Sequence, residues 1–409
     1  MTSPRLVGAL ALVAAGSVLL AGCVAKTDAA ASATIAVTST ADACDVSAST
    51  AKSGTLAFEV TNAGSDVTEF YLLAKDGLRI VGEAENIAPG ASRTLTVVAQ
   101  PGDYYTVCKP GMTGDGVGRA AFTVTGDRVA VEGEGAGQHK DAIDGYAEFV
   151  EEQVGQLVPA VQAFVVAYKA GDDDAARTQF PQVRAYYERI EPIAEALGDL
   201  DPRLDYREVD AVAEGIAWTG FHRIEKDLWV PAQDALNADG ETPAWQDWAP
   251  STPAQRAEYG DQLVADVQEL HDYVNSADFA STLEDQGVAG LSNGAIALLD
   301  EVATGKITGE EDWWSGTDLS DFAANVEGSK TAFSLVEDLA TAKGDDGSAL
   351  VAQIDAAYAD LEAALAAHGS LAAGFVDYRT VSDQERRALA DLLNALAEPL
   401  SQLTATVLD

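Results

Sequence analysis

Basic side chains are scarce in this chain of 409 residues, since 25 Lys and Arg stand against 66 Asp and Glu, for a formal charge of −41. A field of this sign repels nucleic acid and anionic lipid and attracts cations. We therefore expect no nucleic-acid partner, and we rank polysaccharide binding last among the candidate functions. Disorder of the whole chain is also excluded, because 47% of the residues are hydrophobic.

The familiar sequence patterns of several enzyme classes are absent. There is no G-x-S-x-G nucleophile elbow, no H-E-x-x-H zinc-peptidase helix and no Walker-type phosphate loop. Beyond the N-terminus, no run of residues is long and apolar enough to cross a bilayer.

The N-terminus has the composition of an export signal. Arg5 provides the basic start, an apolar stretch follows over residues 6–20, and Leu-Ala-Gly-Cys ends at Cys23. This pattern predicts a lipoprotein signal peptide at residues 1–22, lipid on the thiol of Cys23 and a short tether at residues 23–32. We expect an exported protein, anchored by lipid to the outer face of the cell membrane. An ordinary signal peptide with an incidental cysteine is the alternative.

Residues 33–130 have the pattern of a small β-domain. Segments of alternating apolar and polar residues, such as TLAFEVTN and RAAFTVTG, are separated by turn signals such as Pro89-Gly90. About six or seven such segments predict a β-sandwich. The Gly-rich, charged stretch at residues 131–140 is the predicted linker.

The pattern changes to helices over residues 141–409. Apolar residues recur at i, i+4, i+8 and i+11, as in Leu350, Ile354, Tyr358 and Leu361. Short connections between such segments predict an all-α domain of two four-helix units packed together. The predicted helices are 141–170, 172–197, 205–230, 254–275, 283–304, 319–342, 346–367 and 381–407.

The best metal-ligand pair is His222 and Glu225, in the stretch TGFHRIEKDLW. At i and i+3 the two side chains leave one helix face and can converge on one ion. The neighbours Phe221, Ile224 and Leu228 are apolar, which places the pair at a bundle interior. A lone H-x-x-E is a weak signal, and a core histidine hydrogen-bonded to a glutamate is the alternative.

An acidic stripe on a neighbouring helix strengthens the metal hypothesis. Glu188, Glu191 and Glu195 stand at i, i+3 and i+7, where a cation would offset their mutual repulsion. Asp205 opens the next predicted helix, as a further ligand or as its cap. One imidazole among several carboxylates suits iron, manganese or zinc, and it suits Cu(I) poorly. A solvated acidic face is the alternative for the stripe.

A third acidic cluster extends from Glu310 to Asp321 around two tryptophans. We interpret it as the capped start of a helix, with Thr317 or Asp318 as the cap, in preference to the wall of a pocket.

The remaining cysteines lie in the β-domain. Once Cys23 carries lipid, Cys44 and Cys108 are left, and two thiols in an oxidising compartment usually form a disulfide. A type-1 copper centre is disfavoured, because it needs two histidines and residues 33–130 contain none. The alternative to the disulfide is a metal site of both thiolates with Glu69, Asp103 or Met112.

The order of motifs closely resembles the EfeO family of iron-uptake proteins, whose helical half is of imelysin type. In the helical half the motifs are Y-E-R-I-E-P-I-A-E, T-G-F-H-R-I-E-K and D-F-x-A-N-V-E-G-S, and in the β-half they are N-I-A-P-G and P-G-D-Y. The similarity covers nearly all of the mature chain. One departure is Gly316, because relatives carry a histidine before T-D-L and any ligand role of that position is lost here.

The resemblance implies a multidomain fold, with an N-terminal all-β cupredoxin-like sandwich and a C-terminal all-α imelysin-like (M75) domain. It implies an extracytoplasmic iron-binding component of an EfeUOB-type uptake system, which binds Fe2+ or Fe3+ and works with an EfeU-type iron permease and an EfeB-type haem peroxidase. The family's metal motifs fall on His222, Glu225, Glu188, Glu191 and Glu195. Its proposed copper or iron site in the β-half falls on Cys44, Glu69 and Cys108.

Binding without catalysis is the leading hypothesis. One enzymatic alternative is an M75-type metallopeptidase, which needs an open metal position and a base such as Glu191 or Glu195. The other is copper- or iron-dependent ferroxidase activity in the β-domain.

Overall fold

The computed structural model describes residues 28–29, 34–112, 114, 116–129, 135–191, 193 and 197–408. The predicted signal peptide, Cys23 and most of the predicted tether lie outside these ranges, as does Glu195. No helix within the described ranges combines the length and the apolar character needed to span a membrane.

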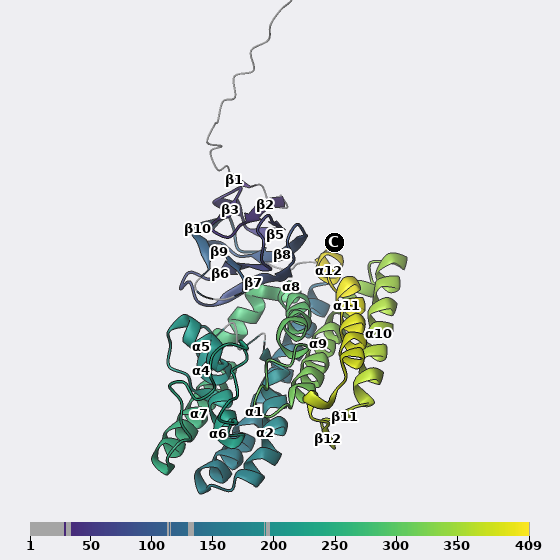
Figure 1. The fold of residues 1–409 in the computed structure, drawn as a ribbon. Helices are drawn as coiled ribbons and strands as arrows, with labels where there is room; N and C mark the ends of the chain where they lie inside the picture. The colour runs from purple at the N-terminus through teal and green to yellow at the C-terminus, as the bar shows by residue number, and fades with distance from the viewer. Residues whose placement is uncertain are drawn as a thin grey trace, which may run out of the picture.

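The N-terminal half is a β-sandwich of two sheets (Figure 1). Its strands are Asp28–Ala29 (β1), Thr34–Ser39 (β2), Cys44–Val46 (β3), Thr50–Lys52 (β4), Gly54–Asn62 (β5), Thr68–Leu73 (β6), Ile80–Ile87 (β7), Ser92–Ala99 (β8), Gly102–Pro110 (β9) and Val117–Thr125 (β10). One sheet has the order β1-β4-β10-β9-β6-β7 and the other β3-β2-β5-β8. The predicted sandwich is confirmed.

Alternating side chains build the interior of the sandwich. In β2 the residues Ile35 and Val37 are buried while their neighbours Thr34 and Ala36 are exposed, as the period of a strand requires. Phe58 of β5 packs against Phe70 of the opposite sheet, with 5.2 Å between ring centroids. The apolar faces of the two sheets thus form one core.

Cys44 in β3 and Cys108 in β9 form a disulfide that joins the two sheets. Of the two alternatives left open by the sequence, the structure therefore has the disulfide, and neither sulfur is a free thiolate ligand. Closing a loop of this length, 64 residues in sequence separation, stabilises the fold by about 4 kcal/mol in the chain-entropy account.

The C-terminal half is helical apart from the short strands β11 and β12, and it has one continuous apolar core. In this half α1 packs against α2 and α7, α8 against α9, and α10 between α9 and α11. The elements are Ala136–Ala170 (α1), Asp173–Glu188 (α2), Leu200–Asp205 (α4), Glu208–Glu214 (α5), Gly220–Leu228 (α6), Pro253–Val274 (α7), Ala277–Glu301 (α8), the π-helix Val302–Lys306 (η1), Asp318–Thr341 (α9), Asp345–Ala366 (α10), Gly369–Ser370 (β11), Gly374–Phe375 (β12), the 3-10 turn Tyr378–Thr380 (η2), Asp383–Leu400 (α11) and Leu403–Leu408 (α12).

Several predicted helix boundaries were wrong. The helix predicted at 283–304 begins at Ala277, and the helix predicted at 381–407 is divided into α11 and α12. The predicted helix 205–230 is divided into the end of α4, then α5 and α6, because Gly215 ends α5 with a φ of 70° and the chain then runs without helix to Thr219. Helix α2 ends at Glu188, well before residue 197. Helix α1 begins at Ala136, so the helix takes up the second half of the predicted linker.

The two halves meet along α8, which lies beneath β7 and β8 (Figure 1). Arg93 of β8 donates hydrogen bonds from both terminal nitrogens to Asp300 near the end of α8. Asn293 of α8 donates to the carbonyl oxygen of Thr96 at 2.9 Å. These polar contacts fix the sandwich on the helical half next to the segment that continues into η1.

Candidate metal centre

The centre forms where α4 and α6 touch. Gly220, the first residue of α6, has a φ of 79°, and a Cβ there would lie 2.0 Å from the carbonyl oxygen of Leu204. Only glycine permits this approach. It brings Asp205, the last residue of α4, to the first turn of α6, where His222 lies.

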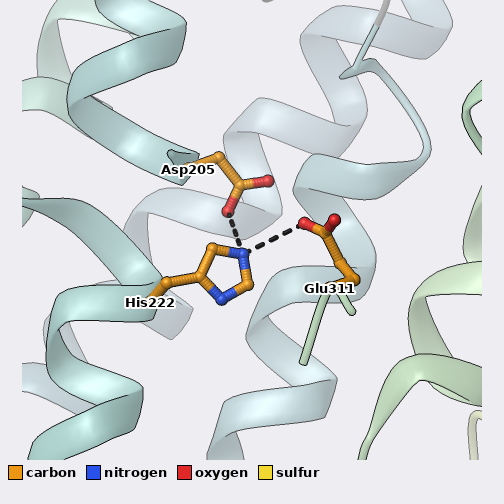
Figure 2. Close-up of side chains that lie close together, drawn as sticks. All are labelled: Asp205, His222 and Glu311. Carbon is orange, nitrogen blue, oxygen red and sulfur yellow. Dashed lines mark hydrogen bonds and ion pairs between the residues drawn. The ribbon is translucent and has the colours of Figure 1, made fainter. Parts of the chain in front are cut away.

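His222 is 2% exposed and has a carboxylate at each ring nitrogen. Its Nδ1 lies 3.0 Å from Oε2 of Glu225. Its Nε2 lies 3.0 Å from Oε1 of Glu311 and 3.5 Å from Oδ1 of Asp205. Figure 2 shows the last two carboxylates approaching the same nitrogen from different segments. One ligand atom from each of Asp205, His222 and Glu311 lies within 4.8 Å of the others, a spacing that one ion can bridge.

Both carboxylate oxygens of Glu225 have polar partners. Its Oε1 accepts hydrogen bonds from the backbone N–H groups of Trp314 and Ser315, at 3.0 and 2.7 Å. Its Oε2 faces Nδ1 of His222. Such a carboxylate fixes the orientation of an imidazole and determines which nitrogen carries the proton.

A fully buried arginine lies among these carboxylates. Arg184 on α2 forms short hydrogen bonds to Asp205 and Glu188, and it donates to Oδ2 of Asp321 at 2.8 Å. Glu311 lies 3.4 Å from the same guanidinium. Arg184 was not predicted from the sequence, because its spacing of four residues from Glu188 is equally that of an ordinary ion pair on a helix surface.

The acidic stripe at the end of α2 and just beyond it also points inward. Glu188 and Glu191 both accept from the side-chain amide of Asn325 on α9, at 3.2 and 2.9 Å. Both carboxylates lie 3.2 Å from the ammonium of Lys306 in η1. Glu188, Glu191 and Asp205 form a further group with ligand atoms within 4.8 Å. The alternative of a solvated acidic face is therefore wrong for these two glutamates.

Negative charge exceeds positive charge in this interior. Within the described part of the chain, eight carboxyl groups contact the three cationic side chains Arg184, His222 and Lys306. We call these eleven side chains the acidic cluster. Its carboxyl groups are those of Glu188, Glu191, Asp205, Glu225, Glu301, Glu311, Asp312 and Asp321.

Burial and mutual repulsion set the protonation of the acidic cluster. Burial raises the pKa of Glu191 well above its usual range, and the charges of Glu188 and Glu301 raise it further. Burial likewise raises the pKa of Asp312 and of Asp321, against the opposing effect of Arg184. Burial and mutual repulsion therefore favour the protonated form of these carboxyl groups, whereas Arg184 and Lys306 favour the ionised form.

The pKa of His222 is also raised, but here the shift favours the charged form. Burial and the nearby Arg184 lower its pKa, but hydrogen bonds to Glu225 and Glu311 and the charge of Asp205 outweigh them and raise the pKa to about 10. Without a bound ion, His222 is therefore a protonated imidazolium that bridges two carboxylates.

For the segment before α9, the sequence predicted a helix cap and not the contacts with His222. Thr317 does occupy the N-cap position, but its side chain makes no capping hydrogen bond, and α9 begins at Asp318. Glu311 and Asp312 instead reach His222, at 3.0 and 3.8 Å. The contact between Glu311 and His222 spans 89 residues of sequence, so no local spacing could reveal it.

Two cavities approach the acidic cluster, and Trp313 and Trp314 line both. The larger has a volume of about 500 Å3, and its lining includes Asp312 and Gly316. The smaller, of about 10 Å3, reaches His222. The centre thus lies close to solvent-accessible space even though its side chains are buried.

The candidates in the β-domain divide into two groups. Glu69 is buried, accepts a hydrogen bond from the hydroxyl of Tyr71 at 2.6 Å, and shares a cavity of about 380 Å3 with Met112. Asp103 lies at the other end of β9 from Cys108, where it accepts a hydrogen bond from Thr123. The structure therefore groups Glu69 with Met112 and leaves Asp103 apart.

The structure thus defines a class of two-part protein. A β-sandwich is fixed to a helical half, and the interior of the helical half holds one histidine among buried carboxylates, which suits a cation. Comparison of the sequence with protein families agrees with both parts. A cupredoxin-like domain matches residues 11–117, and the imelysin (peptidase M75) domain matches residues 142–403.

Relatives with both parts are also found. The chain is 34% identical over 371 residues to proteins named "Iron uptake system component EfeO" from Escherichia coli K12 and from Shigella flexneri, and the match covers 90% of this chain and 90% of each relative. This chain therefore belongs to the EfeO family, with an imelysin domain. The resemblance and the fold expected from the motifs are confirmed.

A solved structure also resembles the chain, to a smaller degree. A crystal structure from Parabacteroides distasonis, of a candidate iron-regulated protein A precursor, aligns with a TM-score of 0.46 at 15% identity, over 66% of this chain and 95% of that one. This likeness is too slight to support any argument.

Proposed function

We propose that this protein is the extracytoplasmic iron-binding component of an EfeUOB-type uptake system. It takes up Fe2+ or Fe3+ and passes the iron to an EfeU-type permease, beside an EfeB-type haem peroxidase. The names of its EfeO relatives support iron as the cargo. The observation that carries the proposal is the convergence of Asp205 and Glu311 on Nε2 of His222.

The proposed ligands are Nε2 of His222 and carboxylate oxygens of Asp205 and Glu311. Glu225 acts through His222, since its two oxygens already face backbone amides and Nδ1. Glu188 contributes from the adjoining group that includes Asp205.

The acidic cluster fits such a cargo in both charge and donor type. Among the described residues, its eight carboxyl groups form ion pairs with Arg184, His222 and Lys306, so carboxyl groups outnumber these cations and a multivalent ion would relieve their repulsion. Oδ1 of Asp312 and Oδ1 of Asp321 are buried and have no hydrogen-bond partner, which leaves lone pairs free to accept. Oxygen donors with one imidazole suit iron, with zinc as the competitor, and suit copper poorly.

The proposed location follows from the N-terminal sequence. Lipid on Cys23 would hold the protein at the outer face of the cell membrane, next to a permease. Cys23 lies outside the described residues, so this anchor remains a prediction.

The peptidase alternative is less well supported by the geometry. A water-activating base needs a free carboxylate oxygen near the metal. Glu191, one predicted base, is bound by Asn325 and Lys306, and Glu225 is bound on both oxygens. The other predicted base, Glu195, lies outside the described residues.

Calorimetric titration with iron, together with metal analysis, tests the proposal. We expect His222→Ala to weaken binding at least about a hundredfold, because it removes the only nitrogen ligand. His271→Ala is the matched control, since His271 lies 3.5 Å from Asp272 on the outside of α7. Equal iron affinity in the two variants would refute the proposed centre.

A further inference from the structure

Lys306 already occupies a cation position inside the acidic cluster. Its side chain is fully buried, and its ammonium lies 3.2 Å from Oε2 of Glu188 and 3.2 Å from Oε2 of Glu191. These two glutamates form, with Asp205, one of the groups tight enough for a metal ion. A bound ion and the ammonium would therefore compete for the same carboxylates.

The ammonium has a third partner, Glu301, which lies at the edge of the acidic cluster. Oε1 of Glu301 lies 2.5 Å from the ammonium, and the Glu301 side chain is 25% exposed whereas those of Glu188 and Glu191 are almost entirely buried. Lys306 can thus keep one ion pair while it gives up the other two. Glu301 is an anchor at the edge of the cluster.

The backbone that carries Lys306 is irregular. Residues 302–306 form a π-helix, in which the N–H of Ile307 donates to the carbonyl oxygen of Val302 at 2.9 Å. A π-helical turn holds one residue more than an α-helical turn, and such turns are concentrated at functional sites. Its looser register gives the lysine a way to change position without unfolding α8.

We propose that Lys306 is an internal competitor that makes the centre selective for multivalent cations. Without a bound cation its ammonium pairs with Glu188, Glu191 and Glu301, and on loading it keeps only the ion pair with Glu301. A monovalent ion would replace one unit charge by another, with no electrostatic gain. A divalent or trivalent ion gains attraction to the same carboxylates and displaces the lysine.

This inference rests on the proposed function, and Lys306→Met tests it. With Mn2+ as the probe at pH 8, we expect the full-length variant to bind at least about tenfold more tightly, because the competing charge is gone. We also expect Na+ to inhibit Mn2+ binding by the variant more than choline at equal ionic strength, whereas the native protein does not distinguish them. Lys330→Met is the control, since Lys330 pairs with Glu362 at 2.8 Å on the surface.

Lys306→Arg is the control for a folding defect caused by substitution at this position. It keeps the positive charge, so its Mn2+ binding should remain insensitive to Na+. Amine acetylation followed by mass spectrometry supplies a second readout: Lys306 should be protected without Mn2+ and modified when Mn2+ saturates the protein. Unchanged or weaker Mn2+ binding by a folded Lys306→Met variant, or protection of Lys306 at saturation, would overturn the inference. A native protein that binds neither iron nor Mn2+ would instead refute the proposed function itself.

Discussion

At the scale of single residues, the centre is a network of oppositely charged side chains that pair with one another. The imidazolium of His222 and the guanidinium of Arg184 both bridge carboxylates from separate segments. Buried charges of this kind are costly unless they are paired. Loading a metal is therefore an exchange of cations and protons within a formed site.

Glu225→Gln tests the positioning of the imidazole. The amide nitrogen of glutamine would donate to Nδ1 of His222, which moves the ring proton to Nε2 and blocks the proposed ligand atom. We expect iron affinity to fall by about 10- to 100-fold, with the folded structure retained. Calorimetric titration measures the change, and native affinity in this variant would show that the tautomer of His222 is irrelevant.

The pH dependence of iron binding follows from His222. Its pKa of about 10 means that binding at neutral pH must release the Nε2 proton. Affinity should rise about tenfold per pH unit for this proton between pH 7 and 9. Titrations in buffers of different ionisation enthalpy count the released protons. A flat profile over this interval would contradict the assignment of His222 as a ligand.

The stability of the cation-free protein should change with pH in the reverse direction. Because folding raises the pKa of His222 above 6.5 to about 10, its stabilising contribution is complete below pH 6.5 and is lost as the pH rises through 10.

At the scale of elements, the centre depends on close contacts between short helices. Asp205 and His222 meet only because Gly220 lets α6 lie against the end of α4. Glu188 meets Asn325 because α9 packs equally closely on the end of α2, where a Cβ on Gly328 would lie 2.3 Å from the carbonyl oxygen of Arg189.

Gly220→Ala tests the contact between α4 and α6. The added methyl group would lie 2.0 Å from the carbonyl oxygen of Leu204 at a positive φ, so we expect a loss of about 2 kcal/mol or more in unfolding free energy and weaker iron binding. Gly155→Ala is the control, because that position of α1 is exposed with open space around it and should gain up to about 1 kcal/mol. Equal stability of the two variants, measured by denaturant unfolding, would rule out the strained contact.

The sequence predicted those elements whose signal is periodic. Alternation identified the sandwich, and the apolar repeat through Leu350 and Tyr358 identified α10. Residues 205–230 were predicted as one helix because their apolar spacing is helical, whereas the positive φ at Gly215 and Gly220 breaks it.

In the centre, too, only residues with a recognisable local spacing could be predicted from the sequence. His222 and Glu225 were recognisable because they lie three residues apart on one helix. Glu311 and Lys306 were not, since only the packing of distant segments brings them to Glu188 and His222.

At the scale of the whole molecule, the sandwich is stabilised separately from the centre. The disulfide of Cys44 and Cys108 joins the two sheets, while the proposed ligands all lie in the helical half. The halves are linked through α8 by ion pairs such as that of Arg93 with Asp300.

Replacing both cysteines of the disulfide by serine should separate these two properties. We expect the sandwich to lose about 4 kcal/mol of stability, while iron still binds the helical half with native affinity. Scanning calorimetry with and without iron measures both effects in one protein. Loss of iron binding in this folded variant would show that the cargo is held in the β-domain.

The most direct measurement is anomalous diffraction at the iron edge from crystals of the iron-loaded protein. We predict a peak between Asp205, His222 and Glu311, with Lys306 drawn toward Glu301. A peak confined to the cavity beside Glu69 and Met112, which the β-domain shares with α5 and Glu310, with the acidic cluster unchanged, would contradict the central claim.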